Sequence, residues 1–66
     1  MKLEYEKEDD VAYIYLEYPI ESGAVKKTIA LNDEIILDFD ENEKLLGVEI
    51  LNASKHLKKQ ILTTTA

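Results

Sequence analysis

Four oxygen-bearing side chains in the second half of the chain have the spacing of a calcium-binding loop. Asp38, Asp40 and Asn42 alternate along the chain, and Glu49 lies eleven residues after Asp38. This series matches the pattern D-x-[DN]-x-[DN] with a distal glutamate, and Ca²⁺ prefers such oxygen ligands. The sixth position, where a glycine normally allows the sharp turn, is Glu43, and the flanking residues alternate as strands do. We therefore expect acids exposed beside a hairpin and no metal, with a calcium or small-ligand site as the alternative.

Groups that could catalyse a reaction are scarce. His56 is the only imidazole, and the chain has no cysteine. Ser54 lies two residues away, but side chains at i and i+2 of a helix do not face each other. Ser22 and Glu49 could reach His56 only through the tertiary fold. The two glycines form no phosphate-binding loop. We therefore expect no enzymatic activity, no catalytic residue and no cofactor.

The tyrosines are better candidates for a functional surface. Four of the five aromatic residues are tyrosines within the first 18 residues, namely Tyr5, Tyr13, Tyr15 and Tyr18. Tyr13 and Tyr15 alternate with apolar residues and share a strand face with Val11. Tyrosine is enriched at interfaces because it joins a large apolar ring to a hydrogen-bonding hydroxyl. We expect Val11, Tyr13 and Tyr15 to form an interface; alternatively, the rings pack across strands within a monomer.

Charge limits the choice of partner. The net charge is −6, from 14 acidic and 8 basic residues, and all the basic residues are lysines. Residues 1–49 hold every acidic residue and five lysines, a net −9, whereas residues 50–66 hold three lysines, a net +3. Nucleic-acid binding depends on neutralising phosphates, and arginine provides the bidentate contacts. We therefore expect a basic protein partner and no nucleic acid.

The length of the chain indicates one domain with a small core. A chain of 66 residues buries only about 60% of the surface that its unfolded form exposes. The absence of cysteine excludes disulfides, and a single histidine without a thiolate falls short of the usual zinc ligand set. Self-association or docking on a partner is then the expected reinforcement. The charged N-terminus and the short apolar runs predict a cytoplasmic protein that does not enter membranes.

The pattern of apolar and turn residues predicts an α+β fold, a small antiparallel β-meander of about five strands with one C-terminal helix. The predicted strands are 2–6, 11–18, 25–31, 35–39 and 44–51. Within the single domain 1–66, residues 1–51 form the sheet, 52–62 the helix and 63–66 a frayed tail. Asn52 or Ser54 is expected to cap the helix with its side-chain oxygen.

Four blocks of the sequence resemble a known family of small bacterial and archaeal proteins. The blocks are YE (5–6), DVAYI (10–14), ILDFD (36–40) and GVEILNAS (47–54), the last being the most specific. The family is catalogued as domain of unknown function 2283, and the resemblance covers about residues 5–57. The chain departs from the family pattern in the turn 41–44, which lacks a glycine, and at Ala12, which replaces a larger apolar residue.

The resemblance implies a small sheet with a short helix and no established activity. It also implies an antitoxin-like role, since some members are suspected to be encoded beside small toxin-like proteins. Together with the charge and the tyrosines, this favours a protein-interaction module. We expect it to form a homodimer or to bind a basic partner, through the face of Tyr13 and Tyr15 or an edge strand. The alternative is a ligand- or calcium-binding protein that uses the acidic hairpin.

Overall fold

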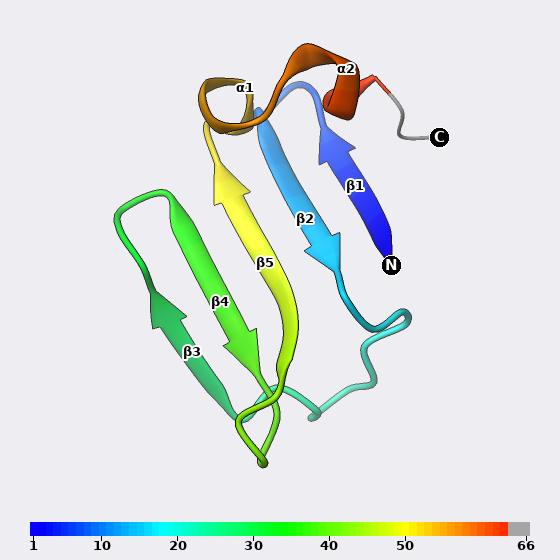
Figure 1. Cartoon of the computed structure of the whole chain (residues 1–66), viewed down its shortest axis with the longest axis vertical. Helices are drawn as coiled ribbons and strands as arrows, with labels where there is room; N and C mark the ends of the chain where they lie inside the picture. Colours follow the sequence, from blue (N-terminus) through cyan, green and yellow to red (C-terminus); the bar gives the residue numbers. More distant parts are fainter. Residues whose placement is uncertain (64–66) are drawn as a thin grey trace.

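Five short segments rich in apolar and β-branched residues form strands, and they make one antiparallel sheet within residues 1–63, the part of the chain that the computed structural model describes. The strands are β1 (Lys2–Glu6), β2 (Val11–Tyr15), β3 (Lys27–Ala30), β4 (Ile35–Phe39) and β5 (Leu45–Leu51), followed by the short helices α1 (Ala53–His56) and α2 (Lys59–Leu62) (Figure 1). The predicted α+β class and antiparallel sheet are confirmed.

The strand order differs from the predicted meander. The order across the sheet is β1-β2-β5-β4-β3, so β5 lies between β2 and β4, and β2 does not pair with β3. Residues 16–26 instead carry the chain from β2 to the far edge of the sheet, where β3 begins (Figure 1). The physical reason lies in β5, a seven-residue strand with apolar side chains on both faces. Such a strand gains most from having a neighbour on each side.

The predicted single helix over 52–62 is two four-residue helices in the described part of the chain. They are separated because Leu57 and Lys58 are extended, with φ/ψ of −115°/141° and −64°/148°. Asn52 precedes α1 in the left-handed region, and its side chain does not cap the described helix. In the predicted frayed tail 63–66, the Thr63 amide donates to the Lys59 carbonyl (3.0 Å), while 64–66 lie outside the described residues.

The pleat of the sheet produces two chemically different faces. We call one the apolar face; it is formed by Leu3, Tyr5, Ala12, Ile14, Ile29, Ile35, Leu37, Val48 and Ile50, with Lys27 at the start of β3. We call the other the tyrosine face; it is formed by Glu4, Glu6, Val11, Tyr13, Tyr15, Thr28, Ala30, Ile36, Asp38, Gly47 and Glu49. The helices pack on the apolar face, which leaves the tyrosine face without a second layer in residues 1–63.

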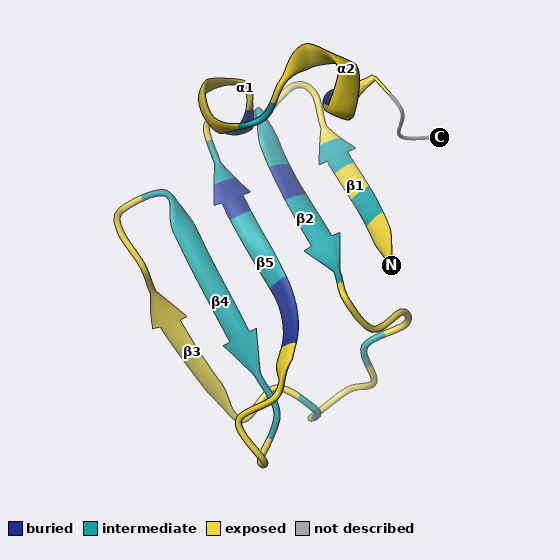
Figure 2. Cartoon of the chain, in the orientation of Figure 1, coloured by how far each residue is buried: buried dark blue, intermediate teal, exposed yellow. Residues whose placement is uncertain are grey.

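The core is small and lies at one end of the sheet. Its buried members are Ala12, Ile50, Ala53 and Leu62, surrounded by partly buried apolar residues. Among residues 1–63, no large side chain is fully buried. Figure 2 shows the buried residues in β2 and β5, while both helices are mostly exposed and bury only Ala53 and Leu62; β3 is exposed along its length. No helix in the described range has the length and apolar character needed to cross a membrane.

Candidate functional site

The three predicted interface residues lie together on the tyrosine face. Val11, Tyr13 and Tyr15 alternate along β2 and are each partly buried. The registers of β2 with β1 and β5 place Glu4 and Glu49 on either side of Tyr13. A row across the sheet therefore consists of a carboxylate, a phenol ring and a second carboxylate.

Tyr13 is held in place by contacts with β4 and β5. Its hydroxyl donates to Asp38 Oδ2 (2.7 Å), and Thr28 Oγ1 donates to the other oxygen of the same carboxylate (2.8 Å). The ring crosses Gly47, where an added Cβ would lie only 2.6 Å from Tyr13 Cζ. Burial, together with the neighbouring Asp38 carboxylate, raises the pKa of Tyr13 well above its ordinary range. Tyr13 is thus a fixed, neutral ring at the centre of the face.

Tyr15 and Tyr18 extend the aromatic surface toward the N-terminus. The ring centroids of Tyr13 and Tyr15 are 4.7 Å apart, and those of Tyr15 and Tyr18 are 5.0 Å apart in an edge-on arrangement. The Tyr15 hydroxyl donates to Glu4 Oε1 (2.8 Å), and this hydrogen bond is the main cause of its raised pKa. These ring contacts run along β2 and into the residues that follow it, rather than across strands as the alternative expected.

One lysine of the chain already occupies this surface. Lys2 Nζ lies 4.2 Å from the centroid of the Tyr18 ring and 3.7 Å from Glu4 Oε2. Tyr18, and then Glu4, raise the pKa of Lys2. An ammonium group between an aromatic face and a carboxylate combines a cation–π contact with an ion pair. The tyrosine face can therefore hold a cationic side chain.

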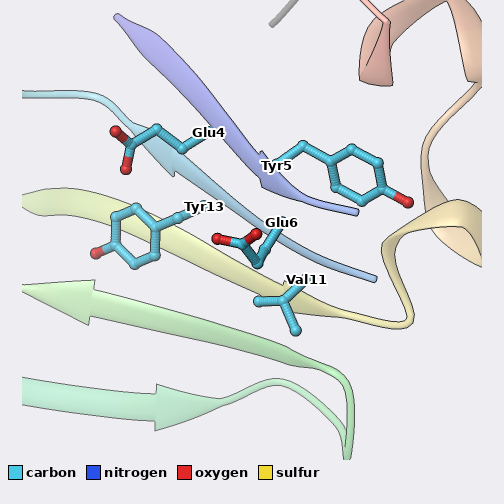
Figure 3. A pocket seen from close by; sticks show the side chains of 5 residues that line it. All are labelled: Glu4, Tyr5, Glu6, Val11 and Tyr13. Atoms are coloured by element: carbon cyan, nitrogen blue, oxygen red, sulfur yellow. The ribbon is translucent and has the colours of Figure 1, made fainter. Parts of the chain in front are cut away.

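A shallow hollow of about 370 Å³ lies beside this arrangement, lined by Glu4, Tyr5, Glu6, Val11 and Tyr13. Figure 3 shows Glu6, Val11 and Tyr13 grouped at its centre, with the Tyr5 ring turned away from them. The Glu6 and Glu49 side chains are free of hydrogen-bond and ion-pair partners within residues 1–63. The hollow thus combines an apolar floor, an aromatic ring and an unpaired carboxylate.

The predicted calcium quartet is divided between two places. Asp38 and Glu49 lie on the tyrosine face of neighbouring strands, whereas Asp40 and Asn42 lie in the β4–β5 turn. Asp40 Oδ1 accepts the amides of Asn42 (2.8 Å) and Lys44 (2.9 Å), so it stabilises the turn. No group of three or more histidine, aspartate or glutamate side chains in the described chain is placed to hold a metal ion.

His56 interacts with a residue that the sequence did not suggest. Its Nε2 lies 2.8 Å from Glu34 Oε1, rather than near Ser22 or Glu49. Glu34 also accepts from the Asn52 amide and from Lys55 Nζ (3.3 Å). Hydrogen bonds from Asn52, His56 and Lys55, in that order, lower the pKa of Glu34 to about 2. This cluster joins α1 to the β3–β4 turn.

Asp10 is a second residue that sequence reasoning missed. Its Oδ1 accepts from the Tyr5 hydroxyl (2.7 Å) and the Ser54 amide (2.9 Å), while Oδ2 accepts from Ser54 Oγ (2.6 Å). Its carbonyl oxygen accepts the Ala53 amide (2.8 Å). These bonds, chiefly from Ser54, lower the pKa of Asp10. Asp10 therefore provides the cap that Asn52 or Ser54 was expected to provide, and no local spacing could have indicated it.

Comparison with known proteins agrees with the resemblance predicted from the sequence. The model of a family described as "Protein of unknown function (DUF2283)" matches residues 2–54. A relative, "Uncharacterized protein MJ0789" of Methanocaldococcus jannaschii, is 46% identical over 55 residues. The match covers 83% of this chain and 43% of that relative, so the chain spans less than half of its length. No solved structure matches this chain.

Proposed function

Because the chain belongs to the DUF2283 family, whose function is unknown, we propose a role from its surface: a protein-interaction module that binds a basic segment of a partner protein on its tyrosine face. The observation that carries this proposal is the position of Lys2 against Tyr18 and Glu4. A lysine or arginine of a partner would occupy the equivalent position beside Tyr13, between Glu6 and Glu49.

The geometry of the face supports a partner in extended conformation. Glu4 and Glu6 point to the same side of β1, and residues two apart in a strand are separated by about 7 Å. Lysines at every second position of an extended peptide have the same spacing. Tyr13, on the neighbouring strand β2, is held by its hydrogen bond to Asp38, so binding requires little reordering of its ring.

The charge of the chain supports a basic partner. A net charge of −6 attracts cationic proteins and accelerates their association. The contacts of the tyrosine face would then select among them, because an apolar floor and a ring favour a lysine stem over a small cation. An antitoxin-like role, in which the module covers a basic protein in the cytoplasm, is one form of this function. No observation favours the calcium-binding alternative, and we propose binding rather than catalysis.

The test uses a twelve-residue peptide with lysine at every second position and a control peptide in which glutamine replaces each lysine. Binding is followed by amide chemical shifts in ¹H–¹⁵N spectra. We expect shifts centred on Val11 and Tyr13 with the lysine peptide and none with the control. Each lost cation–carboxylate contact is worth about 0.5–1 kcal/mol, so Glu6→Gln and Glu49→Gln should each weaken binding about two- to fivefold.

The matched control is Glu21→Gln, which removes the same charge from the exposed loop between β2 and β3. This variant should weaken binding less than either substitution on the tyrosine face. An equal loss in all three variants would mean that the peptide senses only net charge, and the proposal would be wrong. Shifts centred away from β1 and β2 would also contradict it.

A further inference from the structure

Much of the apolar face has no covering layer among residues 1–63. The two helices lie at one end of the sheet, near the ends of β1, β2 and β5, whereas β3 is exposed and β4 is only partly buried (Figures 1 and 2). Leu16 is 38% exposed, Ile29 41% and Leu31 66%. Leu37, paired with Ile29, lies between this exposed edge and the core. Exposed aliphatic residues therefore continue from the core to the edge of the sheet.

The molecule is more open than a compact monomer of its mass. The accessible surface is 4878 Å², whereas a compact monomer of 7.6 kDa is expected to expose about 4,300 Å². The radius of gyration is 11.9 Å, compared with about 10.8 Å expected for 66 residues. Over its whole surface, the chain therefore exposes about 600 Å² more than a compact monomer of its mass.

The distribution of charge indicates which surface two copies could share. The tyrosine face carries Glu4, Glu6, Asp38 and Glu49, so contact between two tyrosine faces would bring like charges together. On the apolar face, the described strands contribute no carboxylate. Its one cation, Lys27, lies at the start of β3 and pairs with Glu43 (3.7 Å). Two chains of charge −6 can therefore meet through the apolar face with their acids directed outward.

We propose that a second copy of this chain covers the bare part of the apolar face and forms a two-layer homodimer. The contact is isologous, since the same aliphatic patch faces itself across a two-fold axis. Ile29 and Leu37 are its central residues, and the exposed Leu31 follows directly after β3. A second copy is favoured over another protein because the surface is neutral and self-complementary, and because the monomer has few other sources of stability. The tyrosine faces stay on the two outer sides.

The test compares Ile29→Glu with Ala30→Glu, two substitutions at adjacent positions of β3 that add the same charge. Ile29 lies on the apolar face and Ala30 on the tyrosine face. Sedimentation equilibrium of the wild-type chain should give twice the 7.6 kDa mass of one copy. We expect Ile29→Glu to weaken dimerisation at least tenfold and Ala30→Glu to leave it within about twofold. Leu31→Glu, at a 66% exposed position beyond the strand, provides a second variant with little risk to folding.

Far-ultraviolet circular dichroism of each variant establishes that the monomer is folded. Isotope-filtered NMR of a labelled and unlabelled mixture should show contacts between methyl groups of Ile29 and Leu37 in different copies. A wild-type chain that is monomeric at millimolar concentration would overturn the proposal. So would equal effects of the two β3 variants, or intermolecular contacts along the β3 backbone, which would indicate edge-to-edge pairing. Peptide binding on the opposite face is measured independently, so either proposal can fail without the other.

Discussion

The contact between Tyr13 and Gly47 gives the sharpest prediction. In Gly47→Ala, the new methyl group would lie 2.5 Å from Cε1 and 2.6 Å from Cζ of Tyr13, and closer still to the phenolic oxygen. These distances are too short for any real contact. Gly47 itself is buried in a strand paired on both sides, so the backbone cannot move away. The ring must leave its position and lose the hydrogen bond to Asp38.

The size of the effect follows from three contributions. Forcing a methyl group into a packed site costs about 1–3 kcal/mol. Loss of a hydrogen bond to a carboxylate costs about 1.5–3 kcal/mol when buried, and less at this partly exposed position. Replacing glycine by alanine restricts the unfolded chain and returns about 0.4–1 kcal/mol. We expect a net loss of about 1–2 kcal/mol in the free energy of unfolding, equivalent to a fall of roughly 5–15 °C in Tm for a domain of this size.

A double-mutant cycle isolates the contact from the general effect of the substitution. Urea unfolding is followed by circular dichroism for the wild type, Gly47→Ala, Tyr13→Ala and the double variant. With Tyr13 truncated, the alanine methyl meets no ring, and Gly47→Ala should stabilise the protein by about 0.4–1 kcal/mol. The sign of the effect thus reverses between the two backgrounds. If Gly47→Ala has the same effect in both, the ring does not lie over this glycine and the reasoning is refuted.

Three further predictions concern the turns and the helix attachment. Glu43 has a φ of 61°, a backbone conformation that favours glycine. Glu43→Gly should therefore raise the free energy of unfolding, measured by urea titration, by about 0.5–1 kcal/mol. A decrease would contradict the idea that the backbone at Glu43 is strained. The pKa of Glu34 is about 2 in the fold and 4.5 ordinarily, so the stability that its ionised form provides is complete above pH 4.5 and disappears as the pH falls from there toward 2. The Tm of Glu34→Gln should therefore depend less on pH in that window than the Tm of the wild type. An identical pH dependence would show that Glu34 is not the group responsible. In Asp10→Asn, hydrogen exchange at the Ser54 amide should accelerate more than at Ile50 in β5, because the charged acceptor is lost; uniform acceleration would show that Asp10 acts on the whole fold instead.

The strands were predictable from the sequence because their signal is local. The alternation of Leu3 and Tyr5 with charged residues identified β1, and the apolar run that begins at Ile35 identified β4, both at their observed bounds. The strand order was not predictable, because it depends on long-range pairing. The loop 16–26 carries β3 to the far edge of the sheet, which leaves β5 free to pair with both β2 and β4. The apolar residues Ala53, Leu57 and Ile61 have the i, i+4, i+8 spacing of one helix face, which favours a single helix over 52–62. The chain breaks there because Leu57 becomes extended as it packs on the core.

The candidate site was partly predictable, because the side chains of one strand alternate between its two faces. Placing Val11, Tyr13 and Tyr15 on one face requires only the two-residue period of a strand. The partners of their hydroxyls depend on the tertiary fold, since Asp38 is separated from Tyr13 by 25 residues. Asp10 and Ser54 are 44 residues apart, and only the assembled sheet brings them together. Gly47 was the one local signal of the Tyr13 contact, because an isolated glycine in a strand often marks a close approach by another group.

The central position of β5 has a consequence for how the chain reaches its native state. Along residues 1–63, β5 is the last strand to leave the ribosome, yet it joins the β1–β2 hairpin to the β3–β4 hairpin. An isolated two-stranded hairpin is only marginally stable in water, so neither half persists until β5 arrives. The nascent chain therefore stays largely unfolded until β5 has been synthesised. It then folds in one cooperative step, in which closure of the long loops limits the rate.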